Sequence, residues 1–146
     1  MYLALFSKNN KKQREINNRA EKLYSFALKK TRKKVFYEDY GVPDTFDGRF
    51  DLLLLDIFLI YYKLYDLEDY QDLSQAIFDV KFKDMDQTLR EMGIGDMGIP
   101  KHMRRMMNAF NGRMHSYLAA IAPDRINEKI YTEIEKGELE DVLRRN

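Results

Sequence analysis

The stretch Leu52-Leu-Leu-Leu-Asp-Ile-Phe-Leu-Ile60 decides the fold class of this chain of 146 residues. A helix built from it is apolar on nearly every side, and such a helix lies buried among other helices. The run is too short for a membrane span and contains Asp56. Asp44 or Thr45 can cap its start. We therefore predict an all-α protein with a central apolar helix over residues 45–65.

Helical spacing continues on both sides of this segment, and no alternating strand pattern or internal repeat interrupts it. Before it, a helix is expected over about residues 11–30, followed by a short helical or irregular segment over 31–40. The apolar stripe of the first helix comprises Ile16, Ala20, Leu23, Tyr24 and Ala27. After it, helices are expected over about 73–92 and 100–122, and a last one with Ile126, Ile130 and Ile134 inward that ends at Gly137.

These elements predict a single-domain bundle of about six helices with short connections. Residues 1–40 form a basic N-terminal helical segment, packed as one domain with a helical core over 41–146. The chain has no cysteine, which excludes disulfides and thiol catalysis. The apolar start, Met-Tyr-Leu-Ala-Leu-Phe, precedes its basic residues, the reverse of a secretory signal, so no cleaved signal is expected.

Charge is divided unequally along the chain. The net charge is +1, yet residues 1–40 hold eleven Lys/Arg against four Asp/Glu, a net of +7. The remainder then carries a net of −6. The basic third fits an anionic partner such as RNA or the cytoplasmic face of a membrane. An ordinary solvated helix, balanced by the acidic remainder, is the alternative.

A literal G-x-G-x-x-G occurs at Gly93, Gly95 and Gly98. A dinucleotide-binding loop needs a strand before this motif, whereas here a helix precedes it. Gly93 stands where a helix end favours positive φ, and Pro100 stands where a helix start tolerates a missing N–H. We interpret the motif as a turn between two helices.

Polar candidates for catalysis or metal binding are weak. Asp84 and Asp86 point about 200° apart on a helix, and His102 and His115 roughly 140° apart, so neither pair can hold one ion. No motif supports an enzyme, a cofactor or a metal site. A salt-bridge ladder is expected from Asp79, Lys83, Asp86 and Arg90, and solvation is favoured for Asp84 and Glu91.

Two charged residues near the central helix need partners. Asp56 needs one if it is buried, and an ion pair across helices is the preferred solution. Arg49 can bond backbone carbonyls or a carboxylate of a neighbouring helix, or can face a binding partner. Gly48 and the charges around it are costly choices at a helix start.

Seven of the eight methionines lie between residues 85 and 114. Methionine is flexible and is over-used on adaptable binding surfaces, although it also fills gaps in cores. Both interpretations stay open for the helix over 100–122, whose stripe at spacings of three and four residues is the cleanest in the chain. Some of these side chains could line a groove for an apolar client segment.

Three runs resemble the ubiquinol–cytochrome c chaperone family, the assembly factors for cytochrome b of the respiratory bc1 complex. They are Gly-Val-Pro-Asp-Thr-Phe-Asp-Gly-Arg-Phe-Asp (41–51), Phe-Lys-Asp-Met-Asp-Gln-Thr-Leu-Arg-Glu-Met-Gly-Ile-Gly-Asp (82–96) and Met-Asn-Ala-Phe-Asn-Gly-Arg (107–113). The resemblance covers about residues 41–122. Two positions depart from the family pattern: Asp56, where a His is common, and Asn111, where a Tyr is common.

The resemblance implies an all-α assembly chaperone of a bacterial type, without catalysis or cofactor of its own. It implies that the protein holds newly made cytochrome b for maturation into the bc1 complex, and mitochondrial members work with a small partner protein near the ribosome. The expected location is the cytoplasm, or the periphery of the inner face of the inner membrane. Residues 8–34 are the expected contact with membrane or ribosome.

A client-binding or partner-binding surface is predicted from charged and apolar side chains within the resembling region, residues 41–122. Its residues are Arg49, Phe82, Met85, Lys101, Met103, Arg104, Phe110 and Arg113. Two other classes compete. A helical module that binds RNA or a membrane surface would depend on the basic N-terminal third alone. An enzyme would require a pocket with convergent polar groups.

Overall fold

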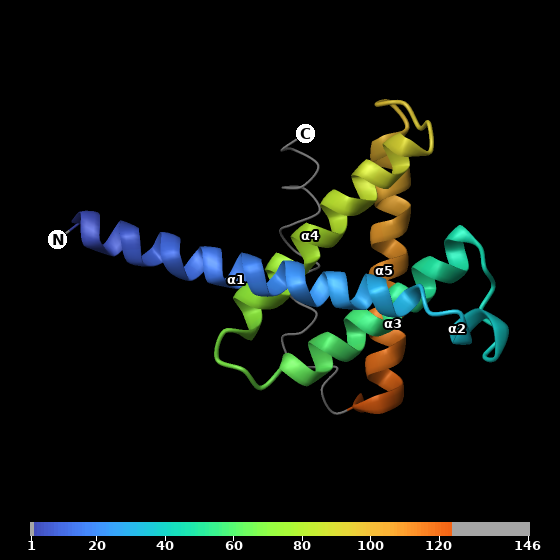
Figure 1. The fold of residues 1–146 in the computed structure, drawn as a ribbon, viewed down its shortest axis with the longest axis horizontal. Coiled ribbons are helices and arrows are strands. Elements are labelled where there is room, and N and C mark those ends of the chain that lie inside the picture. The colour runs from blue at the N-terminus through green and yellow to red at the C-terminus, as the bar shows by residue number, and fades with distance from the viewer. Residues whose placement is uncertain (1, 124–146) are drawn as a thin grey trace. The chain divides into compact units, whose positions relative to one another are not determined.

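The computed structural model describes residues 2–123, with side chains from Asn9 onward. All regular structure in this range is helical, which confirms the all-α class (Figure 1). The five helices are α1 (Tyr2–Thr31), α2 (Val35–Glu38), α3 (Phe46–Leu64), α4 (Tyr70–Glu91) and α5 (Ile99–Ile121). The last expected helix, with Ile126, Ile130 and Ile134, lies outside the described residues.

Two compact units make up the chain, and the boundary between them falls after Asp84, inside α4. The N-terminal unit contains α1, α2, α3 and the larger part of α4. The C-terminal unit contains the end of α4, the following turn and α5.

The first helix is longer than predicted, because it begins at Tyr2 rather than near residue 11. Neither proline nor glycine occurs before Thr31, so nothing in the sequence ends the helix early. α1 packs on α3. Its buried face comprises Ile16, Ala20, Tyr24, Ala27 and Thr31. Leu23, predicted to belong to this stripe, is only half-buried at its edge.

The start of α3 explains a glycine that helix propensity disfavours. Thr45 caps the helix, since its side-chain hydroxyl accepts a hydrogen bond from the Gly48 N–H at 3.1 Å. A Cβ at position 48 would lie 2.0 Å from the carbonyl oxygen of Pro43. Only glycine lets the Gly41–Asp44 segment pass this close to the first turn of the helix.

Burial along α3 agrees with its apolar composition. The buried residues are Gly48, Leu52, Leu53, Leu54, Asp56, Ile57, Phe58 and Tyr61. Tyr61 also donates a hydrogen bond to the Ser74 carbonyl of α4 at 3.0 Å. Two large apolar residues of α3 are exposed, Phe46 at its start with 38% of its surface and Leu59 with 39%. α3 is thus buried over most of its circumference but not all of it.

The turn after α4 confirms that the glycine motif is a helix stop. Gly93 has φ of +85°, and its N–H bonds to the Arg90 carbonyl at 3.0 Å. The N–H of Ile94 bonds to the Leu89 carbonyl at 3.1 Å. These two bonds form a Schellman motif, which closes a helix end around a residue of positive φ. Pro100 then occupies the first turn of α5.

The polar residues of α4 follow the prediction in part. Arg90 pairs with Asp86 at 2.9 Å and also bonds Asp96 of the turn. Asp79 instead accepts a hydrogen bond from Gln75 at 2.9 Å. The preference for a solvated Asp84 was wrong, because Asp84 accepts a hydrogen bond of 2.6 Å from the Tyr24 hydroxyl of α1. The helical period alone could not place this partner from a distant helix.

Candidate functional site

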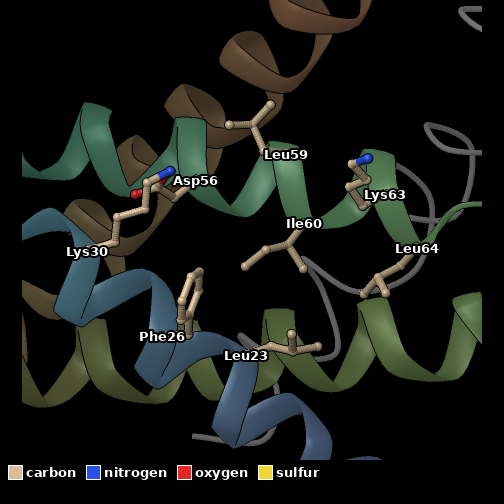
Figure 2. A pocket seen from close by; sticks show the side chains of 8 residues that line it. All are labelled: Leu23, Phe26, Lys30, Asp56, Leu59, Ile60, Lys63 and Leu64. Atoms are coloured by element: carbon tan, nitrogen blue, oxygen red, sulfur yellow. The ribbon is translucent and has the colours of Figure 1, made fainter.

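An apolar groove of about 220 Å³ runs between α1 and α3 in the N-terminal unit (Figure 2). Leu23 and Phe26 line it from α1, and Ile60 faces them from α3. The other lining residues are Lys30, Asp56, Leu59, Lys63 and Leu64. Leu23 is half-buried and Phe26 is exposed, whereas the neighbouring Tyr24 and Ala27 of α1 are buried.

A partly buried ion pair closes one end of the groove. Lys30 reaches from α1 to Asp56 of α3, with 2.6 Å between Nζ and Oδ1 (Figure 2). The Asp56 side chain is 5% exposed and that of Lys30 is 34% exposed. Among the described residues, the second oxygen of Asp56 has no hydrogen-bond partner. The predicted ion pair across helices is confirmed, and Lys30 supplies almost all of the compensation for the buried carboxylate.

Replacing Lys30 should lower the free energy of unfolding more than replacing Asp56. Lys30→Ala leaves a buried carboxylate without its cation, and we expect the free energy of unfolding to fall by about 2 to 3 kcal/mol. Asp56→Asn should cost roughly 1 kcal/mol, because the ammonium of Lys30 can turn to water. Urea denaturation measures both. Lys29→Ala, at a neighbouring exposed lysine, is the control, and an equal loss there would contradict the ion-pair argument.

A second charged side chain is buried in the N-terminal unit. Lys81 of α4 has no exposed surface, and its Nζ lies 5.1 Å from the ring centroids of both Phe50 and Phe82. Desolvation lowers the pKa of this ammonium well below its usual value of 10.5. Burial withholds the group from external substrates, so we assign it a structural role.

The eight residues of the predicted client surface differ in burial. Its four apolar members are buried, with exposed fractions of 4% for Phe82, 5% for Met85, 9% for Met103 and 0% for Phe110. Side chains this buried contribute through packing. Each of the four charged members, by contrast, is exposed.

The charged members belong to different units, and those on α5 do not share one face of that helix. Arg49 is held by Asp44 at 2.7 Å, and its guanidinium lies 5.7 Å from the Tyr37 ring centroid. Arg104 and Arg113 are nine residues apart on α5, which places them about 180° apart around the helix. The buried stripe of α5 runs between them. As a binding surface, the eight-residue set stays a prediction.

Methionines on the turn before α5 differ from those within the helix. Met103, Met106, Met107 and Met114 are all buried, together with Met85 at the end of α4. Met92 is 57% exposed and Met97 is 97% exposed. The core-filling interpretation therefore applies to the α5 stripe, and an adaptable apolar surface remains at the turn.

The groove was not predicted from the sequence. The available signal was Phe26, which lies outside the predicted apolar stripe of the first helix. In the structure this side chain is 62% exposed. An aromatic residue on the polar side of a basic helix is an unusual choice. Its neighbours Ile60 and Lys63 come from a different helix, and only packing brings them to the same place.

The part of the chain that the structure describes, residues 2–123, contains no group of three or more His, Asp or Glu side chains placed to hold a metal ion. None of its five helices combines the length and hydropathy that crossing a bilayer requires.

Comparison with known proteins identifies similar sequences and folds. The family model described as "Ubiquinol-cytochrome C chaperone" matches residues 38–146. A crystal structure described as the Cbp3 homolog from Brucella abortus is similar to this chain, with a TM-score of 0.59 and 31% sequence identity. The similarity covers 92% of this chain and 80% of that one. No curated protein matches the chain.

Proposed function

The chain belongs to the ubiquinol–cytochrome c chaperone family, and we propose that it holds newly made cytochrome b for maturation into the respiratory bc1 complex. The observation that carries the proposal is the family match over residues 38–146, three quarters of the chain. The 31% identity to the Brucella abortus Cbp3 homolog supports it. The family is one of chaperones, which supports a role without catalysis.

We propose that the client contacts the turn between α4 and α5. Met92 and Met97 are exposed there, within and just after the run over 82–96 that carries the family resemblance. Flexible thioether side chains adapt to varied apolar partners. Lys101 and Arg104 follow on the exposed side of α5 and provide a polar rim. The long apolar helices of cytochrome b would supply the matching surface.

Removing the two exposed methionines should weaken client capture without unfolding the protein. We expect the double variant Met92→Ser and Met97→Ser to bind cytochrome b about 30-fold more weakly and to recover correspondingly less of it, because burying each side chain contributes on the order of 1 kcal/mol. The measurement is affinity purification of the tagged full chain from membranes making the bc1 complex, with cytochrome b quantified in the eluate. Circular dichroism checks folding.

Tyr40→Ser is the matched control, since Tyr40 is 74% exposed and lies outside the resembling turn. It should leave recovery unchanged. Recovery of cytochrome b by wild type, with no loss in the double variant, would place the client contact elsewhere. Repeated absence of cytochrome b from the wild-type eluate, together with normal bc1 levels after deletion of the gene, would refute the proposed function itself.

A further inference from the structure

We propose that the face of α1 centred on Phe26 docks on a membrane surface rich in anionic lipid, with Phe26 entering the boundary between headgroups and acyl chains. The proposal concerns a surface distinct from the turn assigned to the client, and it goes beyond the proposed function. It depends on three observations: an exposed aromatic side chain, the apolar groove beside it, and a cluster of lysines around both.

Phe26 lies at the junction of two hollows. On one side is the apolar groove between α1 and α3. On the other side is a shallow hollow of about 430 Å³ on α1 alone, lined by Asn18, Glu21, Lys22, Ser25, Phe26 and Lys29. With 62% of its surface exposed, Phe26 is the most exposed large apolar residue of α1 among the described side chains. An exposed aromatic ring next to an apolar hollow suits insertion at the level of lipid headgroups.

The charge around Phe26 complements an anionic surface. Lys22 and Lys29 stand four residues before and three residues after it, so they share its side of the helix. Lys63 lines the groove from α3, and all three lysines are exposed. Glu21 is the acidic side chain of the α1 hollow. Lys30 is paired with Asp56, which leaves a net charge of +2 for this cluster.

The shape of the groove favours lipid over two other partners. Its apolar part on α3 extends from Leu59 to Leu64, about 8 Å along the axis. A docking helix inserts a row of anchoring side chains from two helical turns, which requires a longer groove. Single-stranded RNA needs aromatic platforms for successive bases. Among the described residues that line the groove, Phe26 is aromatic and the other apolar ones are aliphatic.

The absence of tryptophan from the chain permits a direct test. In the full-length variant Phe26→Trp, the indole reports its own surroundings. We expect a blue shift of emission on adding vesicles of equal parts phosphatidylglycerol and phosphatidylcholine, and no shift with phosphatidylcholine alone. Tyr40→Trp, at a position that is 74% exposed and does not line either hollow, should show no shift with either vesicle. An unchanged emission of Phe26→Trp would overturn the proposal.

Vesicle sedimentation tests the lysines. The double variant Lys22→Gln and Lys29→Gln should bind the anionic vesicles about 30-fold more weakly, since each lysine near such a surface contributes on the order of a fivefold factor. Lys83→Gln, at an exposed lysine of α4, is the matched control and should bind as wild type does. Equal binding by the double variant would overturn the proposal.

Two outcomes identify another partner. Stronger binding to a single-stranded RNA homopolymer than to anionic vesicles, lost in the double lysine variant, would assign this face to RNA and overturn the lipid proposal. An emission shift of the Phe26→Trp variant with an acidic synthetic peptide, and no response to vesicles, would assign the face to a protein segment and overturn it too. The purified chain meets no cytochrome b in these experiments, so their failure is separate from failure of the proposed function.

Discussion

Replacing Phe82 with aspartate is expected to unfold the N-terminal unit. The Phe82 side chain is 4% exposed, and its ring centroid lies 4.2 Å from that of Phe78. Truncating a buried phenylalanine costs about 3 to 5 kcal/mol, and an aspartate adds a carboxylate to the same space. An ion pair with Lys81 would at best offset the burial of that charge, and the lost ring contacts would remain uncompensated.

The measurement for Phe82→Asp is the thermal unfolding curve followed by circular dichroism. Typical stabilities are about 5–15 kcal/mol, so a loss of about 4 kcal/mol or more removes a large share of the total and should lower the melting temperature by roughly 10 °C or more. Phe82→Leu, which keeps the position apolar, is the control and should cost roughly 1 to 2 kcal/mol. A Phe82→Asp protein with a wild-type melting temperature would show that this side chain is accessible, as a client-binding role requires.

The stability of the protein should rise as pH increases towards 10 from the lowered pKa of Lys81, and Lys81 should cause much of that rise. Burial lowers the pKa of Lys81 in the folded state well below the value of 10.5 that applies when the chain is unfolded. Between these two pKa values the unfolded state binds a proton that the folded state does not. Stability therefore increases with pH in this window, by about 1.4 kcal/mol per pH unit.

Lys81→Met should flatten this dependence, because methionine keeps the buried stem and removes the titrating group. Denaturation at a series of pH values measures the slope. The series should stop below about pH 10, since burial raises the pKa of Tyr24 and raises that of Tyr70 to about 12. These tyrosines lower stability only at pH values above the unfolded tyrosine pKa of 10.0.

Lys83→Met is the control for the pH series, since Lys83 lies on the same helix and is exposed. Its slope should match that of wild type. If the Lys81→Met variant shows the same slope as wild type, groups other than Lys81 cause the dependence of stability on pH. The contacts of Lys81 with two aromatic rings favour the charged form and so set a limit on the size of the effect.

Several features were predictable because they depend on neighbours in the chain. Interactions within a single helical turn determine three of them: the positive φ of Gly93, the cap by Thr45 and the place of Pro100 in the first turn of α5. Local chemistry also explains the boundaries of α3 and α5, which lie within one or two residues of those predicted. α1 was the exception, since a helix with no stop signal can extend further than its apolar stripe.

The predicted client surface depended on a pattern that exposed and buried side chains share. Methionine and phenylalanine at helical spacing look the same whether they fill a core or face a client. Burial decides between the two, and it assigns Met103 and Phe110 to the core. Met92 fitted the apolar stripe of the helix expected over 73–92, but α4 ends at Glu91 and leaves this side chain 57% exposed. Met97 lies in the turn, outside any helical stripe, so periodicity could not single out the exposed pair.

The sequence by itself determined the helices, their caps, the turn at Gly93 and the need for a partner at Asp56, because each depends on residues within a few positions or on the cost of burying a charge. Only the tertiary structure decided that Lys30 is this partner and that Tyr24 bonds Asp84. It also decided that Phe26 and Ile60 border one groove. These pairs are tens of residues apart, and many distant side chains satisfy the same chemical requirement. Packing of α1 on α3 selects Lys30 for Asp56 and brings Phe26 to Ile60, and the approach of α1 to α4 selects Tyr24 for Asp84, since side chains interact only where the backbones bring them close.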